Sequence, residues 1–314
     1  MRCTFGIDTS NYTTSVALYL PEQGEVRQQK KLLPVKAGAI GLKQSEAVFH
    51  HVRQLPELCQ ALFDGVENLE LKAVGASARP RDAQDSYMPC FLVGKGTGTA
   101  VASSHGCPIH LFSHQDGHIM AALYGADCLP LKKAPFLAFH LSGGTTECLQ
   151  VTPKGQTFQV ELVARSLDLK AGQAIDRVGV LMGLPFPAGP KLEELALQSD
   201  RIYHPHPTMK GLDCCLSGLE NQCRNLLQRG ESPAHVARFC LDAVRCTLRE
   251  MTCRVLQERG EQPLLYSGGV MSNSIIRDDL TRTFGGHFAP REFSADNAAG
   301  IALLAAAEEG MLCG

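Results

Sequence analysis

Residues 136–151 read FLAFHLSGGTTECLQV, which is an apolar strand, a turn of serine, glycine and threonine, and a second apolar strand. Residues 3–20 read CTFGIDTSNYTTSVALYL and repeat that order around a polar turn of their own. Strand-like runs follow at 27–33 and 158–165, so both segments predict a three-stranded meander. Two meanders that each lead into helices are typical of a duplicated α/β fold with a small polar loop after the first strand of each half.

The chain is long enough for two hydrophobic cores. It has 314 residues and a mass of 33.9 kDa, and 44% of its residues are hydrophobic. We expect an N-terminal α/β lobe over 1–130 and a C-terminal α/β lobe over 131–314, with a nucleotide cleft between them. The last helix is predicted at 298–309, and the sequence leaves open whether it packs back across both lobes.

Composition excludes several classes of protein. The 30 basic and 32 acidic residues give a net charge of −2, whereas a broad nucleic-acid surface makes a protein more basic. The 13 cysteines form no Cys-x-x-Cys pair, which argues against a zinc ribbon and a thioredoxin-like site. Many unpaired thiols, a charged N-terminal start and no apolar run of about 20 residues predict a cytoplasmic protein.

Three of the predicted strands end in short polar loops. These loops are Asp8-Thr9-Ser10, Ser142-Gly143-Gly144 and Ser267-Gly268-Gly269. Backbone amides in such loops donate to phosphate oxygens, and glycine lets a ligand approach closely. No Gly-Lys-Ser/Thr follows, so a Walker A loop is excluded. One loop alone is more often a simple turn, but three at matching strand ends predict a bound nucleotide.

His114 and His118 stand four residues apart in a helix predicted over 114–124. Side chains with this spacing project from one helix face, as two helical ligands of a divalent metal must. Asp296, behind the apparent N-cap Ser294 of the last helix, is the best-placed carboxylate for a third ligand. The glutamate of H-E-x-x-H is missing, so a zinc protease would lack its general base. The alternative is one surface and one partly buried histidine without a ligand.

A set of motifs follows one order along the chain, from residue 6 to about residue 302. In that order they are Gly6-Ile7-Asp8-Thr9-Ser10, the His114/His118 pair, Leu141-Ser142-Gly143-Gly144-Thr145, Ala171-Gly172-Gln173-Ala174-Ile175-Asp176, Pro187-Ala188-Gly189-Pro190, Asp213 with Ser217-Gly218-Leu219, Ser267-Gly268-Gly269-Val270 with Asn273, and Asp296-Asn297-Ala298-Ala299. The ordered set resembles the TsaD-type tRNA threonylcarbamoyltransferases, once labelled glycoproteases.

The resemblance implies an RNase H-like fold of the actin, sugar-kinase and Hsp70 type. It also implies a metal-dependent acyltransferase of tRNA processing. Such an enzyme moves the threonylcarbamoyl group of threonylcarbamoyl-adenylate to the exocyclic amine of the adenine beside the tRNA anticodon. The resemblance further implies that the protein works with small partner proteins or as a dimer, and that it does not act at a membrane.

The same resemblance assigns roles to residues of this chain. One divalent ion, iron or zinc, is expected on His114, His118 and Asp296. The adenylate, or ATP in its place, is expected at His140, Leu141, Ser142, Gly143, Gly144, Asp176, Gly189 and Asn273. Residues expected to support the cleft are Asp8, Ser10, Gly172, Gly268 and Gly269. No catalytic group beyond the metal site is assigned.

The sequence departs from the family pattern beside the expected cleft. Asn11 and Tyr12 replace an acidic pair, and Arg79-Pro80-Arg81 replaces the Gly-Pro-Gly loop of the family. Thr145 replaces a histidine, and Glu220 replaces a lysine. Two other functions therefore stay open. One is a related transferase that uses carbamoyl-adenylate, as the HypF type does, with an acceptor other than tRNA. The other is a catalytically weak nucleotide-binding partner protein.

Overall fold

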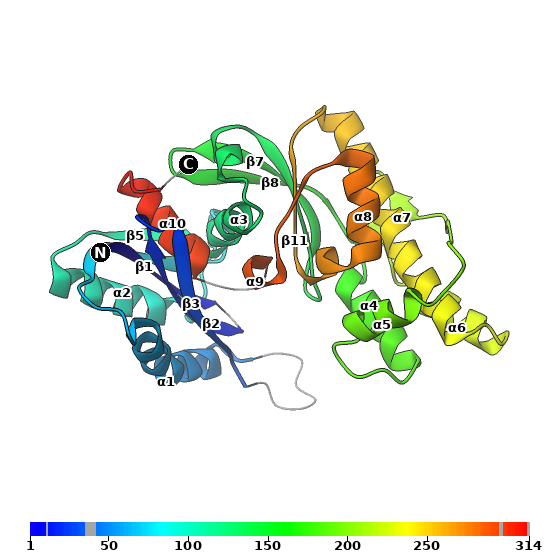
Figure 1. Ribbon diagram of the computed structural model, residues 1–314, viewed down its shortest axis with the longest axis horizontal. Helices are drawn as coiled ribbons and strands as arrows, with labels where there is room; N and C mark the ends of the chain where they lie inside the picture. Colours follow the sequence, from blue (N-terminus) through cyan, green and yellow to red (C-terminus); the bar gives the residue numbers. More distant parts are fainter. Residues whose placement is uncertain (11, 35–41, 295–297, 313–314) are drawn as a thin grey trace. The chain divides into compact units, whose positions relative to one another are not determined.

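The computed structural model describes residues 1–10, 12–34, 42–294 and 298–312 (Figure 1). The chain divides into two compact units. The first comprises Met1–Lys133, Pro153–Gln159 and Glu292–Gly314, and the second comprises Ala134–Thr152 and Val160–Arg291. The boundary expected at 130/131 lies close to the first observed division, at 133/134. The observed division differs in that two later segments, Pro153–Gln159 and Glu292–Gly314, also belong to the first unit. The last of them returns to the first unit because α10 (Ala299–Glu308) packs against β1, β2, β4 and α3.

The first unit contains a five-stranded sheet in the order β3-β2-β1-β4-β5. Antiparallel β1, β2 and β3 form the predicted meander, and β4 and β5 run parallel to β1. Their bounds are Arg2–Ser10, Thr13–Leu20, Glu25–Leu32, Glu70–Arg79 and Ile109–Ser113. The sheet is mixed, and β1 and β2 are buried along almost their whole length.

Helices cover both faces of this sheet. Leu55, Leu58 and Leu62 of α1 (Gln44–Phe63) and Ala102 of α2 (Phe91–His105) pack into one cluster with apolar residues of β1 and β2. α10, drawn in red in Figure 1, lies against the opposite face next to α3 (His114–Gly125). Gly6 permits that packing, because a Cβ at this position would lie 2.5 Å from the amide nitrogen of Ala302.

The second unit contains a five-stranded sheet in the order β12-β11-β6-β7-β8. β7 runs antiparallel to β6, whereas β11 runs parallel to both β6 and β12, so this sheet is also mixed. The strand bounds are Phe136–Leu141 for β6, Thr146–Lys154 for β7, Thr157–Arg165 for β8, Leu264–Ser267 for β11 and His287–Phe288 for β12. The two sheets confirm the predicted α/β class.

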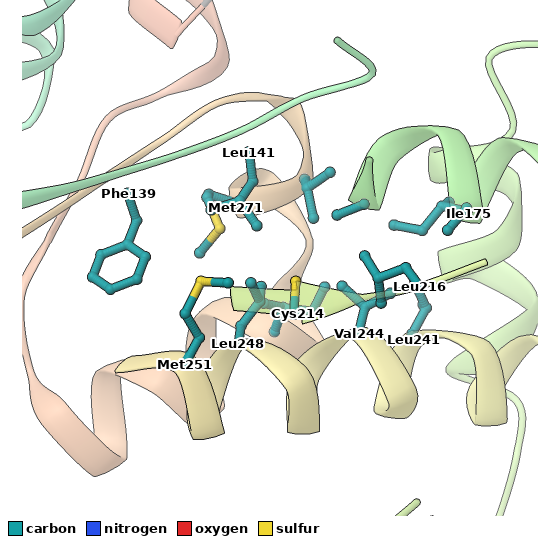
Figure 2. Packing of buried hydrophobic residues seen from close by; sticks show 14 of the residues in the cluster. Phe139, Leu141, Ile175, Cys214, Leu216, Leu241, Val244, Leu248, Met251 and Met271 are labelled. Carbon is teal, nitrogen blue, oxygen red and sulfur yellow. The ribbon is translucent and has the colours of Figure 1, made fainter. Parts of the chain in front are cut away.

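Helices of the second unit pack around one long helix, α7 (Pro233–Arg259), whose inner face is buried. Figure 2 shows Leu241, Val244, Leu248 and Met251 projecting from α7 toward Leu141 and Met271 in the core. The unit also contains α4 (Ala171–Leu181), α5 (Gly189–Ala196), the hairpin β9 (Thr208–Lys210) and β10 (Asp213–Cys215), α6 (Leu219–Gln228) and α8 (Ser274–Phe284). The short α9 (Arg291–Ser294) begins at the last residue of this unit and continues into the first. Among the described helices, none has both the length and the apolar character to cross a membrane.

Candidate functional site

Three parallel strands of the first unit end at one edge of their sheet. β1 carries Asp8 near its end, β4 carries Ser77, and β5 leads through Ser113 directly into α3. Ser113 caps this helix: its hydroxyl accepts from the Asp116 amide at 3.0 Å, and the Asp116 carboxylate accepts from the Ser113 amide at 3.3 Å. The capping box fixes the first turn of α3, which carries His114.

Asp8 orients the ring of His114. Nδ1 of His114 lies 2.9 Å from Oδ2 of Asp8, whose side chain is 0% exposed. The other oxygen of Asp8 accepts from the Ser77 hydroxyl. Because an ionised carboxylate only accepts, His114 donates its Nδ1 proton and keeps a lone pair on Nε2. Nε2 of His118 lies 2.8 Å from that nitrogen, so both imidazoles point at one spot.

This donor set fits a divalent metal. Metal-binding histidines usually donate their second ring nitrogen to a carboxylate, as His114 does. Two nitrogens at about 2 Å from one ion in tetrahedral geometry are about 3.3 Å apart. The observed 2.8 Å between the two Nε2 atoms therefore needs an opening of only about half an ångström.

The expected third ligand, Asp296, lies outside the described residues, as does Asn11. Within the described part of the chain, no three His, Cys, Asp or Glu side chains gather closely enough to hold a metal. The role of Asp296 in completing the site stays a prediction.

A cavity of about 490 Å³ lies in the second unit. The starts of α4 and α5, the turn after β6 and the turn before α8 surround it. Of the residues assigned from sequence, the cavity walls include Ser142, Gly143, Gly172, Asp176, Gly189, Gly269 and Asn273. Helix N-termini carry partial positive charge, so three helices that begin here suit an anionic group such as phosphate.

Close backbone packing builds the wall formed by the turn after β6. The Ser142 hydroxyl accepts from the amides of Gly144 at 3.2 Å and Thr145 at 3.1 Å, which closes the turn. Gly172, in the first turn of α4, lies directly against it, since a Cβ at Gly172 would lie 2.7 Å from the Gly143 nitrogen. A larger residue at position 172 would displace the turn from the cavity.

Other assigned residues support the loops without lining the cavity. Nδ1 of His140 lies 3.0 Å from the Ser267 hydroxyl oxygen, and Leu141 is buried in the core. Gly268 has a φ of 98° and sits on the carbonyl of Leu141, where a side chain would clash. Asp8 and Ser10 belong to the first unit.

The sequence did not point to several residues of the cavity wall. Phe186, Glu193 and Arg291 are among them. Oε1 of Glu193 accepts from the amide of Ser274 at 2.7 Å and from its hydroxyl at 2.5 Å, which ties α5 to α8. Arg291 supplies a positive charge to the wall, and no motif surrounds it that could have revealed this. Phe186 is 76% exposed, an unusual position for a large apolar side chain.

Asp168 and Asp176 hold the loops around α4. Oδ1 of Asp176 accepts from the Ala188 amide at 2.8 Å, which anchors the segment that presents Phe186. Oδ1 of Asp168 accepts from the amides of Leu169 at 2.6 Å and Leu216 at 2.8 Å. Partial burial alone would raise the pKa of Asp168. Hydrogen bonds from Ser217 and from these amides outweigh it and lower the pKa to about 2.

Comparison with known proteins supports the fold and the family. The TsaD family, described as tRNA N6-adenosine threonylcarbamoyltransferase, matches residues 29–303. Component A of the (R)-2-hydroxyglutaryl-CoA dehydratase of Acidaminococcus fermentans shares 15% identity at a TM-score of 0.56, over 98% of this chain and 99% of that one.

Two further solved structures are similar. The activator of the 2-hydroxyisocaproyl-CoA dehydratase from Clostridium difficile, solved with bound ADPNP, shares 13% identity at a TM-score of 0.53, over 98% of this chain and 96% of that one. HypF of T. kodakarensis shares 15% identity at a TM-score of 0.57, over 99% of this chain but 47% of HypF. At these identities the likeness shows the fold alone.

Proposed function

We propose, because this chain belongs to the TsaD family of tRNA N6-adenosine threonylcarbamoyltransferases, that it transfers a threonylcarbamoyl group from threonylcarbamoyl-adenylate to an adenine amine of tRNA. The acceptor is the adenine beside the anticodon. Family membership makes the protein a transferase-type enzyme, and the donor, the acceptor and the metal are the proposed part. The observation that carries the proposal is the pair of Nε2 atoms, 2.8 Å apart, one of them on a ring held by a buried carboxylate.

The reaction needs positioning more than activation. The donor is a mixed anhydride, so its carbonyl carbon is already reactive. The adenine N6 attacks that carbon, the bond from the carbon to the phosphate oxygen breaks, AMP leaves, and N6 loses one proton to solvent. Holding donor and amine in reach of each other removes much of the entropic barrier.

Residues of the first unit prepare a metal site. His114 and His118 would hold the ion, and the Asp8 carboxylate keeps the His114 ring in its metal-binding tautomer. A divalent ion bound there supplies Lewis acidity toward a carbonyl oxygen. Asp296 is the proposed third ligand.

Residues of the second unit form the proposed adenylate site. The helix starts and the backbone amide of Gly143 in the turn after β6 suit the phosphate. Asp176 and Asn273 lie in the cavity wall and are proposed to bind donor and acceptor groups of the ribose and the base. The guanidinium of Arg291 adds a positive charge to the same wall, which favours an anionic ligand.

The activity is tested with purified protein, threonylcarbamoyl-adenylate, zinc or ferrous iron, any partner proteins, and tRNA that lacks the modification. The tRNA is then digested, and its nucleosides are identified by mass spectrometry. We expect threonylcarbamoyladenosine with the native chain and none with His114→Ala. His105→Ala is the matched control, because this exposed histidine lies at the end of α2 and leaves the site intact.

Other outcomes would favour the alternatives. Release of AMP with unmodified tRNA would indicate a transferase with another acceptor. Neither AMP release nor modified tRNA, with nucleotide still bound, would indicate a partner protein of weak activity.

A further inference from the structure

A groove rich in arginine runs along α7 in the second unit. Its volume is about 620 Å³, and Arg238, Arg245, Arg249 and Arg282 lie in its walls. A second hollow of about 490 Å³ shares Arg245, Arg249 and His204 with it, so the two are continuous. α8 and the segment 202–207 form the other sides.

The inner part of the groove is a rigid framework. The buried carboxylate of Asp242 accepts from Nε of Arg238 and Nε of Arg245, both at 2.9 Å, and from the amide of Tyr203 at 2.8 Å. Arg245 also donates to the Tyr203 carbonyl at 2.9 Å. These two arginines are fixed in place and mostly covered.

The outer part carries positive charge with little compensation. Oδ1 of Asp279 lies 3.3 Å from Arg245, 3.6 Å from Arg249 and 3.7 Å from Arg282, so one carboxylate is shared by three guanidiniums. Two further carboxylates lie in the walls: Asp278 pairs with Arg277, and Glu250 of the second hollow pairs with Arg254. Apart from these two pairs, four arginines against Asp242 and Asp279 leave an excess of two positive charges, 4 − 2. The side chains of Arg249 and Arg282 are 50% and 76% exposed. This local excess stands out in a chain of net charge −2.

The spacing of the charges suits an extended ligand. Arg238, Arg245 and Arg249 are seven and four residues apart, so they lie on one face of α7. At 1.5 Å per residue they span about 16 Å. Ile275 in the groove wall comes two residues after Asn273 in the cavity wall, so a ligand in the groove lies close to the proposed adenylate site.

The weakness of each single contact favours a polyanion as the ligand of the groove. An exposed ion pair contributes little to binding, so Arg249 and Arg282 would hold one small anion weakly. A chain of phosphates makes several such contacts together and gains further from the release of bound counterions. We propose that this groove docks the phosphate backbone of RNA, with Arg249 and Arg282 as the principal contacts. The inference rests on the proposed function, which supplies an RNA acceptor.

The experiment measures binding of unmodified tRNA to the full chain at several salt concentrations, without donor or metal. We expect Arg249→Ala and Arg282→Ala each to weaken binding about three- to tenfold near 50 mM salt. A plot of the logarithm of the association constant against the logarithm of the salt concentration has a negative slope. Each substitution should make this slope less steep by about 0.7 to 0.9, the value for one lost phosphate contact. The double variant should show about twice that change in slope.

Arg259→Ala is the matched control. Arg259 lies on the same helix but bonds to Glu161 at 2.7 Å, and it lines neither hollow. We expect its affinity and salt slope to match those of the native chain. Thermal unfolding of each variant verifies that the fold is retained.

The outcomes separate this inference from the proposed function. Strong tRNA binding with unchanged affinity and salt slope in both groove variants would contradict RNA docking in this groove. It would leave the proposed function unaffected. No tRNA binding by the native chain, even with partner proteins, would overturn both. Full competition by millimolar inorganic phosphate, or tighter binding of polyglutamate than of RNA, would also overturn it, in favour of a small anion or an acidic protein.

Discussion

Oδ2 of Asp8 lies 2.9 Å from Nδ1 of His114, across 106 positions of sequence. Asp8 lies near the end of a buried strand and His114 begins a helix, so parallel strands bring the pair together at one sheet edge. The sequence assigned Asp8 to a nucleotide loop. The structure places it behind a histidine, where it fixes which ring nitrogen faces His118.

Removal of the Asp8 carboxylate is expected to weaken the metal site. Asp8→Ala should lower affinity for zinc about 10- to 100-fold, because His114 loses the acceptor that orients its ring. Competition against a fluorescent zinc chelator measures this change. Asp8→Asn keeps an acceptor oxygen and should fall between the native chain and Asp8→Ala. Equal zinc affinity in all three would contradict the assigned role of Asp8.

A methyl group at Gly172 is expected to disturb the cavity. Gly172→Ala places a Cβ 2.7 Å from backbone atoms of Ser142 and Gly143, which cannot move as a side chain does. Overpacking should lower the free energy of unfolding by about 1–3 kcal/mol, more than the gain of up to about 1 kcal/mol from helix propensity. Urea unfolding measures the difference.

Gly144→Ala serves as its control, since nothing lies within 4 Å of a Cβ at that position. This variant should unfold within about 0.5 kcal/mol of the native chain. Equal stability of both variants would contradict the claim that close packing of α4 on the turn after β6 requires glycine at position 172.

Asp168 is expected to stabilise the protein in a pH-dependent way. Its pKa is lowered to about 2 in the folded chain, against about 3.9 in an unfolded one. The contribution is therefore complete above about pH 4 and is lost as the pH falls toward 2. Asp168 is exposed, so solvent screening reduces this contribution. Asp168→Asn should lower the free energy of unfolding by about 1 kcal/mol at pH 7, and this deficit should disappear near pH 2.

Urea unfolding of both proteins across this pH range measures the deficit. Asp278→Asn is the control, because that carboxylate lies 3.5 Å from Arg277 on the surface and should show little deficit at any pH. A deficit for Asp168→Asn that is the same at pH 7 and pH 2.5 would show that its charged form is not what stabilises the loops.

Phe186→Trp is expected to report on ligand binding in the cavity. The chain has no tryptophan, so the new side chain is the only indole. Phe186 is largely exposed on the cavity wall, and the larger ring should fit without loss of stability. Titration with an adenine nucleotide should change its fluorescence in a saturable way.

Phe49→Trp tests the specificity of that response. Phe49 is 56% exposed and lies on α1 in the first unit. Its fluorescence should stay constant through the same titration. A change at both positions, or at neither, would argue against nucleotide in this cavity.

Strong periodic patterns made much of the fold predictable. The two meanders and the long helix α7 follow directly from apolar runs and helical spacing. α6 was missed because only Leu219 and Cys223 are buried on it, too few to show a period. α2 begins at Phe91 and does not include Met88, since Pro89 disfavours helical backbone at the residue before it.

The site was predictable only where its residues are close in sequence. The His114/His118 pair is visible because four positions make one helical turn. Ser77 behind Asp8, and Arg291 in the cavity wall, depend on contacts between distant segments and leave no local pattern. Such residues become visible only once the strands have paired.

Diffraction at a metal absorption edge can locate the ion in crystals grown with zinc or ferrous iron. We expect one anomalous peak about 2 Å from Nε2 of both His114 and His118, with the Asp8 carboxylate still bonded to Nδ1 of His114. Crystals saturated with metal that show no peak there, and leave the two Nε2 atoms 2.8 Å apart, would contradict the metal site on which the proposed reaction depends.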